Sequence, residues 1–356
     1  MNTIKVNAKE FKKALNRHKA GTSGKVTMPI LGCVILEARS IGLTLDSYDL
    51  LTKVWSHCPT IQGSGTINPA CVEFRSLARA IKASKGEIEI SCSPNDQTIT
   101  IDGSRLATVS CEEFPEFYRS EEAPIETLTL SGVEIATLIK AASKDESRIN
   151  LCGIYVRRQQ LESTDGHRIA AITLDKANDI GIANKIVPTS LFDGISGLET
   201  VTLHLSKDAC WLTNSDYNWS AISRYVDADA PDTAGVYSSL KAGARMTCNQ
   251  SDLEFLLLKS LVDKRDLAQN VVAVTFGADG LIKVERSGQE SSYNGQCSSL
   301  KGGNDQTIGL NAAYVLDAIS GLSGTLHLEI RGVNEPVTIA DSEGKVNSLI
   351  MPAKLA

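Results

Sequence analysis

The sequence predicts an α+β protein made of three similar units, each combining antiparallel sheet with two helices. Two observations predict the repeat. Prolines that follow a pair of alternating strand-like segments occur at Pro115, Pro231 and Pro352, which are 116 and 121 residues apart. Asp46 in LTLDSYD and Asp165 in LESTDGH are 119 residues apart. Three periods of this length fill 356 residues, so the chain reads as one module made three times. The predicted domains are 1–120, 121–241 and 242–356.

Each domain is expected to contain the same kinds of element. Runs of Val, Ile, Leu and Thr that alternate with polar residues predict antiparallel strands in every third of the chain. Two segments with helical spacing interrupt the strands of each domain. These segments are 8–20, 69–83, 132–143, 188–197, 250–263 and 311–321. Capping residues support their starts, because Asn68 precedes a proline and Ser131 forms a capping box with Glu134. Asn249 and Asn311 are the expected caps of the last two helices.

The composition excludes several classes of protein. Apolar residues make up 42% and charged residues 22%, which is typical of a globular domain. No stretch of eighteen apolar residues is present, and the first twenty residues lack the apolar core of a signal peptide. The nine cysteines are scattered without a CxxC pair, which argues against a disulfide framework or a zinc site. We therefore expect a cytoplasmic protein without a membrane partner, a metal or a cofactor.

The charge distribution suggests a polyanionic partner despite a net charge of −6. Residues 1–120 carry a net +3 (15 basic, 12 acidic) and the remainder a net −9 (21 basic, 30 acidic). In the first helix, Phe11, Leu15 and His18 mark the buried face, and the basic residues fall on the other side. Basic residues also recur on helices of the first two domains, and together these candidate contacts to a polyanion are Lys9, Lys13, Arg17, Arg75, Arg79, Lys82, Lys140 and Lys144. Such cations would bind phosphates without reading bases. For any single helix, a merely solvated basic face is the alternative.

One short motif also permits an enzymatic interpretation. Residues 163–168 (STDGHR) bring together a hydroxyl, a carboxylate, an imidazole and a guanidinium. A catalytic hypothesis would use Asp165 to orient His167 as a general base. The structural alternative is a tight Asp-Gly turn that leads into a strand starting at Arg168. No nucleophile or cluster of metal ligands accompanies the motif, so we expect the protein not to be an enzyme.

The whole chain resembles the bacterial β sliding clamp, the β subunit of DNA polymerase III, as a divergent member. Five groups of residues carry the resemblance in the family's order and spacing. They are 28–31 (MPIL), 113–115 (EFP), 151–153 (LCG) with 164–168 (TDGHR), 310–317 (LNAAYVLD) and 349–352 (LIMP). The resemblance implies a head-to-tail homodimeric ring with helices on its inner face and sheets outside, through which duplex DNA passes without sequence specificity. The implied partners are the replicative DNA polymerase, an ATP-dependent clamp loader and other proteins that carry clamp-binding peptides.

The resemblance also assigns roles to individual residues. Lys25 and Arg148 join the expected DNA contacts, and Leu261 and Val262 fall in the segment implied for the dimer interface. A groove between domains two and three is implied for partner peptides. Its expected residues are Leu151, Thr164, Gly166, His167, Arg168, Ile169, Pro231, Val236, Asn311, Tyr314, Pro336, Leu349, Ile350, Met351, Pro352, Ala353, Lys354 and Leu355.

Departures from the family pattern leave a second function open. Gly235 stands where the family often has an arginine, and Ala353 and Lys354 replace a common Met and Arg. The net −9 of residues 121–356 favours the alternative, a peptide-binding ring or scaffold that no longer retains DNA.

Overall fold

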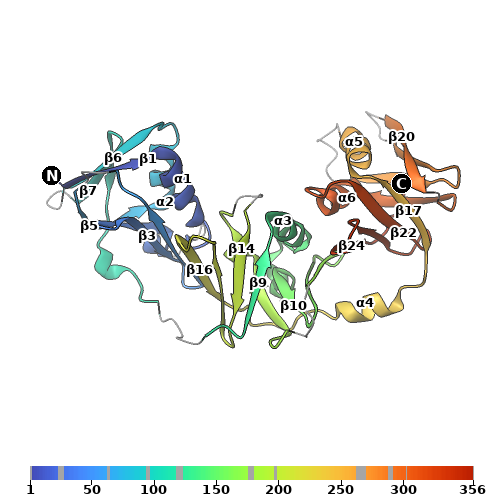
Figure 1. Cartoon of the computed structure of the whole chain (residues 1–356), viewed down its shortest axis with the longest axis horizontal. Helices are drawn as coiled ribbons and strands as arrows, with labels where there is room; N and C mark the ends of the chain where they lie inside the picture. Colours follow the sequence, from blue (N-terminus) through green and yellow to red (C-terminus); the bar gives the residue numbers. More distant parts are fainter. Residues whose placement is uncertain are drawn as a thin grey trace. The chain divides into compact units, whose positions relative to one another are not determined.

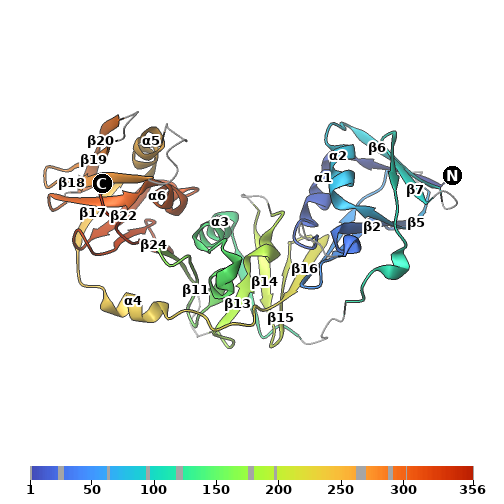
Figure 2. The same ribbon diagram turned by 180° about the vertical axis from the view of Figure 1, so that it is seen from behind.

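The computed structural model describes residues 2–22, 28–61, 65–93, 97–117, 123–174, 180–195, 199–261, 270–287, 292–301 and 303–355. The chain forms two compact units, drawn in Figure 1 and from behind in Figure 2. Unit 1 contains Met1–Gly132 and Val187–Tyr225, and unit 2 contains Val133–Ile186 and Val226–Ala356.

In the residues that the structure describes, unit 1 contains two antiparallel sheets and two helices. The four-stranded sheet has the order β1-β6-β7-β8 and the eight-stranded sheet the order β5-β2-β3-β4-β16-β15-β14-β9. Its strands are β1 (Asn2–Asn7), β2 (Cys33–Arg39), β3 (Gly42–Tyr48), β4 (Thr52–Cys58), β5 (Ile67–Glu73), β6 (Glu87–Ser93), β7 (Thr98–Ile101), β8 (Ser104–Ala107), β9 (Glu126–Leu130), β14 (Val201–Leu205), β15 (Ala209–Thr213) and β16 (Trp219–Arg224). Its helices are α1 (Ala8–Arg17) and α2 (Phe74–Ile81), with 3-10 turns η1 (Pro29–Gly32), η2 (Cys111–Glu113) and η4 (Thr189–Phe192).

The two helices of unit 1 contact each other and share one apolar core with the strands. Asn7 caps α1, because its side chain accepts hydrogen bonds from the backbone N–H groups of Lys9 and Glu10. Phe11 and Leu15 are buried in this core, as their spacing predicts. Leu77 and Ile81 of α2 are buried in the same cluster, so both helices turn one apolar face to the sheets.

Unit 2 contains one twelve-stranded sheet and four helices within the described residues. The strand order is β13-β10-β11-β12-β24-β23-β22-β17-β20-β19-β18-β21. The strands are β10 (Gly153–Val156), β11 (Gln160–Thr164), β12 (Arg168–Thr173), β13 (Lys185–Pro188), β17 (Ala244–Asn249), β18 (Val271–Phe276), β19 (Leu281–Ser287), β20 (Ser292–Lys301), β21 (Gln306–Asn311), β22 (Thr325–Ile330), β23 (Val337–Ala340) and β24 (Val346–Ile350). The helices are α3 (Gly132–Ala141), α4 (Thr233–Ser239), α5 (Gln250–Ser260) and α6 (Ala312–Ile319), with a 3-10 segment η3 (Glu146–Leu151).

The predicted α+β class and its repeated antiparallel units are confirmed. The two compact units divide the second predicted domain, because its strands pair with both neighbours. β16 pairs with β4 of the first predicted domain, and β12 pairs with β24 of the third. Backbone hydrogen bonds between paired strands therefore link the predicted domains. The expected domain boundaries near 120 and 241 stay predictions.

Two helix predictions need correction. Asn68 and Pro69 lie inside β5, and α2 begins only at Phe74. The pairing of β2 with β5 shifts register between Leu36 and Ala38, which is the kind of irregularity where a strand tolerates proline. Within the described part of 188–197, only the short 3-10 turn η4 forms. Asn311 caps α6 as predicted, whereas the Asn249 amide donates to Asp252 and makes no capping bond.

Candidate functional site

A pocket of about 190 Å³ lies within unit 2, at the place where β12, β24 and α4 meet. Its walls are mostly apolar, with a few polar groups from the β11–β12 turn and from α4. The lining residues are Leu151, Thr164, Gly166, Arg168, Ile169, Pro231, Asp232, Thr233, Val236, Leu349 and Met351. Nine of these eleven are residues that the resemblance implies for a peptide groove, and Asp232 and Thr233 are the two that it did not include. An apolar cavity with few oriented polar groups is a common form of ligand site.

The turn between β11 and β12 is held by local hydrogen bonds. Gly166 has φ +94°, a left-handed conformation that favours glycine. The Gly166 N–H donates to Thr164 Oγ1 at 3.0 Å, and the His167 N–H donates to Asp165 Oδ1 at 2.9 Å. The tight Asp-Gly turn expected from the sequence is therefore present. This turn fixes the position of Arg168, the first residue of β12.

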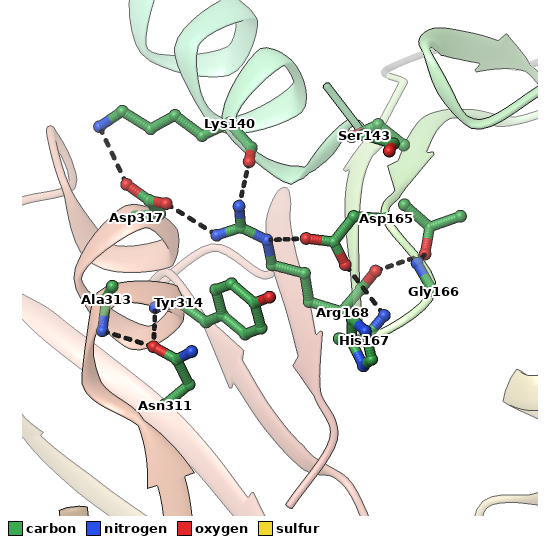
Figure 3. Close-up of polar contacts among 12 residues, drawn as sticks. Lys140, Ser143, Asp165, Gly166, His167, Arg168, Asn311, Ala313, Tyr314 and Asp317 are labelled. Atoms are coloured by element: carbon green, nitrogen blue, oxygen red, sulfur yellow. Dashed lines mark hydrogen bonds and ion pairs between the residues drawn. The ribbon is translucent and has the colours of Figure 1, made fainter. Parts of the chain in front are cut away.

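The guanidinium of Arg168 connects segments that the sequence places in different domains (Figure 3). Its Nε donates to Asp165 Oδ2 at 3.0 Å, and its Nη1 donates to Asp317 Oδ2 of α6 at 2.8 Å. Its Nη2 donates to the Lys140 carbonyl of α3, and its carbon Cζ lies 4.2 Å from the centre of the Tyr314 ring. Only 11% of the side chain is exposed. Arg168 therefore joins the walls of the site, and its charge is already compensated by two carboxylates.

Tyr314, Asn311 and His167 lie beside the pocket. The Asn311 side chain accepts hydrogen bonds from the backbone N–H groups of Ala313 and Tyr314, so it caps α6. Tyr314 and Ile350 line a small cavity of about 10 Å³ that shares Arg168 and Ile169 with the pocket. The exposed His167 ring stacks on Tyr314 with 6.4 Å between ring centres.

The hydrogen bonds of Asp165 differ from those that the catalytic hypothesis requires. Both oxygens of Asp165 are used by the His167 backbone and by the Arg168 guanidinium, so the carboxylate does not orient the His167 imidazole. This arrangement differs from that of an acid–base pair, in which the carboxylate binds the ring nitrogen.

Among the residues described by the structure, no group of three or more His, Cys, Asp or Glu side chains could hold a metal ion.

The C-terminal segment 349–355 is divided between two surfaces. Leu349 and Met351 line the pocket, and the Met351 N–H donates to the His167 carbonyl at 3.0 Å. After the half-buried Pro352, the Ala353 N–H donates to the Gly309 carbonyl of β21 at 2.8 Å. This bond directs the end of the chain away from the pocket.

Three predicted groove residues lie away from this pocket, and their role in peptide binding stays a prediction. Lys354 and Leu355 line a separate cavity of about 910 Å³ beside β18, β19 and β20. Pro336 is buried next to β23, where its carbonyl accepts a hydrogen bond from Arg331 Nη1 at 3.2 Å, and it lines neither the pocket nor the small cavity. The register of the last strands, rather than sequence position, decides which side chains reach the pocket.

The basic residues of unit 1 fall into two classes. Lys9 and Lys13 of α1 are exposed, as predicted. Arg75 and Arg79 of α2 and the following Lys82 are also exposed. The exposure of these five residues is compatible with contacts to phosphate.

Arg17 belongs to the other class, and the prediction of an exposed contact is wrong. Its side chain is 3% exposed and forms an ion pair with Glu199. Its Nη1 donates to the Gly194 carbonyl at 3.0 Å, and its Cζ lies 4.6 Å from the Trp219 ring centre. Gly194 and Glu199 therefore contact the last turn of α1, which helical periodicity alone does not predict. Arg17 therefore joins α1 to the strands β14–β16.

The basic residues predicted as DNA contacts in unit 2 also differ in exposure. Lys144 and Arg148 are exposed, and Arg148 Nε lies 3.4 Å from Asp145 Oδ2. Lys140 is half-buried, because its Nζ donates to Ser320 Oγ and lies 4.0 Å from Asp317 Oδ1. Lys25 lies outside the described residues.

The residues implied for a dimer contact lie at the end of α5. Leu261 is the C-cap residue and packs against the core of unit 2, and Val262 lies outside the described residues. The same helix exposes Phe255 (58%) and Leu258 (56%), three residues apart on one side. Sequence reasoning missed these two, although two large apolar residues outside the buried positions of a helix are a readable signal.

No helix in the described part of the chain is long and apolar enough to span a membrane.

No family model matches the sequence. The chain is similar to bacterial β sliding clamps in sequence and to DNA polymerase III β subunits in structure. The β sliding clamp of Proteus mirabilis is 23% identical over 340 residues, covering 89% of both chains. The clamp of Bartonella birtlesii, solved bound to griselimycin, is 22% identical, covers 99% of both chains and has a TM-score of 0.78. The DNA polymerase III β subunit of Thermotoga maritima is 18% identical and also has a TM-score of 0.78, over 99% of this chain and 100% of that one. The chain thus has the fold of the bacterial DNA polymerase III β subunits, and its predicted resemblance to the β sliding clamps is confirmed.

Proposed function

We propose that this protein is a sliding clamp that encircles duplex DNA as a homodimeric ring and tethers the replicative polymerase. The observation that carries the proposal is the pocket of unit 2, nine of whose eleven lining residues match those implied by the clamp resemblance. The similarity in fold to the β subunits over nearly the whole chain supports the same role.

The exposed cations suit weak binding to a duplex. Lys9, Lys13, Arg75, Arg79 and Lys82 lie on or directly after the helices of unit 1, with exposed side chains. Screened phosphate contacts of this kind carry no sequence information and allow sliding. A closed ring needs no tighter contacts, because topology rather than affinity retains it on a long duplex.

The exposed apolar side of α5 suits the contact between two chains. In the proposed ring, Phe255 and Leu258 extend the surface at Leu261 toward the other chain. Head-to-tail contacts form a closed ring only if the rotation closes, here after two subunits.

The pocket of unit 2 suits short peptides from partner proteins. We propose that the polymerase, the clamp loader and other partners each present an apolar segment to it. Val236, Leu349 and Met351 supply the apolar walls, and the hydrogen-bonded β11–β12 turn supplies fixed polar groups. Because the Bartonella birtlesii clamp was solved bound to griselimycin, we propose that griselimycin also binds this protein and that it does so in this pocket.

The proposal is tested by comparing retention on circular and linear DNA after ATP-dependent loading. The protein should remain on a circular plasmid through a high-salt wash and be lost when one cut linearises the plasmid. Equal retention on both forms would contradict encirclement.

The alternative is a peptide-binding ring or scaffold that does not retain DNA. It is favoured by the internal pairing of Arg17 and Lys140, which removes two of the predicted DNA contacts. A variant with Arg75, Arg79 and Lys82 changed to glutamate distinguishes the two functions. The clamp proposal predicts that this variant loses polymerase processivity, whereas unchanged processivity would favour the alternative.

A further inference from the structure

The segment 231–239 forms one wall of the pocket but has little packing of its own. Pro231 and Val236 line the pocket, and they lie just before and within α4. Thr233 is the one buried residue of this seven-residue helix. A helix this short is not stable by itself, so other contacts must fix the wall.

Arg157, just after β10, supplies two of those contacts. Its Nη2 donates to the Pro231 carbonyl at 2.6 Å and to Thr233 Oγ1 at 3.2 Å. The same guanidinium donates through Nε to Glu162 Oε2 at 3.0 Å and through Nη1 to Asn184 Oδ1 at 3.3 Å. One side chain thus binds both the start of the wall and the sheet behind it.

Glu162 of β11 completes the anchor. Its side chain is 1% exposed, and its carboxylate accepts hydrogen bonds from Thr233 Oγ1 and from Gln160 Nε2. Burial, and after it the negative charge of Glu162, raises the pKa of the Tyr237 hydroxyl on α4. Glu162 also lines one cavity together with Thr233 and Tyr237, which lie one helical turn apart on α4.

We propose that Arg157 and Glu162 are positioning residues that hold segment 231–239 against the sheet and so preform the peptide pocket. Neither side chain lines that pocket; both line a different cavity, which shares only Asp232 and Thr233 with the pocket. The proposal rests on the proposed peptide-binding function. Its physical basis is preorganisation: if the wall is docked for only a fraction of the time, the apparent dissociation constant rises by the inverse of that fraction.

The first arm of the test measures griselimycin binding by titration calorimetry with the full chain. Glu162→Gln removes the charge but keeps the shape, and Arg157→Met removes the bonds to Pro231 and Thr233. We expect both variants to bind griselimycin about threefold to tenfold more weakly than wild type. Glu134→Gln is the matched control, because Glu134 is also buried and ion-paired (with Lys345 at 2.9 Å) but does not line the pocket. It should bind griselimycin like the wild type.

The second arm measures amide hydrogen exchange without a ligand. In Glu162→Gln and Arg157→Met, the amides of 233–239 should exchange at least severalfold faster, while those of β11, β12 and β24 keep their protection. Glu134→Gln should leave 233–239 unchanged. This pattern separates positioning from general destabilisation, which would raise exchange in the sheet as well.

The outcomes distinguish the inference from the function beneath it. If the wild type binds griselimycin, and both variants keep its affinity and its exchange rates at 233–239, the positioning role alone is overturned. Failure of the wild type to bind griselimycin would overturn the proposed pocket function and this role with it.

Discussion

Replacing Arg17 by alanine separates a folding role from a DNA-contact role. The guanidinium is 3% exposed, and its partner Glu199 is 14% exposed. Removing one partner of a buried ion pair costs about 3–5 kcal/mol, because the other charge is left unpaired. Glu199 keeps a hydrogen bond from Trp219 Nε1 at 3.3 Å, so we expect the lower end of that range. The Arg17→Ala variant should therefore lose about 3 kcal/mol of unfolding free energy.

The assay is equilibrium urea unfolding followed by tryptophan fluorescence, since all three tryptophans (Trp55, Trp211 and Trp219) belong to unit 1. Lys13→Ala is the control, because Lys13 lies on the same helix with an exposed side chain. It should change the unfolding free energy by less than about 0.5 kcal/mol and reduce the salt dependence of DNA affinity by about one phosphate contact. An Arg17→Ala variant as stable as the wild type, but weaker on DNA, would refute the structural role of Arg17.

Three further predictions concern the pocket, its turn and a buried histidine. Val236→Asp should weaken griselimycin binding at least about tenfold in a calorimetric titration, because a charge enters an apolar wall; unchanged affinity would place the ligand elsewhere. Gly166→Ala should cost about 1–2 kcal/mol, measured by thermal unfolding, because φ is +94° there; an unchanged melting temperature would argue against this turn. Burial lowers the pKa of His18 to about 3, between the hydroxyls of Ser47 and Ser56. The unfolded chain therefore binds the extra proton below pH 6.5, and His18 should contribute a loss of about 1.4 kcal/mol of stability per pH unit from there toward pH 3. In acid titrations, His18→Gln should remove this contribution, and a pH dependence equal to that of the wild type would contradict the burial of a neutral His18.

The helical stripes were predictable because they depend on local periodicity. The spacing of Phe11 and Leu15 predicts the buried side of α1, and both residues are in the core. The same periodicity places Arg17 with Lys9 and Lys13 on the basic side. It fails for Arg17 because Gly194 and Glu199, almost two hundred residues later in the sequence, cover the end of the helix. Burial by distant segments is not encoded in the spacing of one helix.

The pocket was predictable in its composition but not in its construction. The resemblance supplied most of the lining, including Leu151 and Val236. The resemblance did not include a helix at 233–239. Periodicity did not predict α4 either, because a seven-residue helix with a glycine at position 235 gives no clear periodic signal. Nor could the resemblance show that Arg168 is bound by Asp165 and Asp317, since that depends on the pairing of β12 with β24.

The central claim, a closed ring of two chains, is tested most directly by the mass and shape of the native particle. We predict the mass of two chains by sedimentation equilibrium and a closed ring in single-particle electron micrographs. Leu258→Asp should reduce the mass to that of one chain, because it places a charge on the exposed apolar side of α5. A wild-type particle that stays a single chain at every concentration, or a dimer without a central opening, would contradict the account.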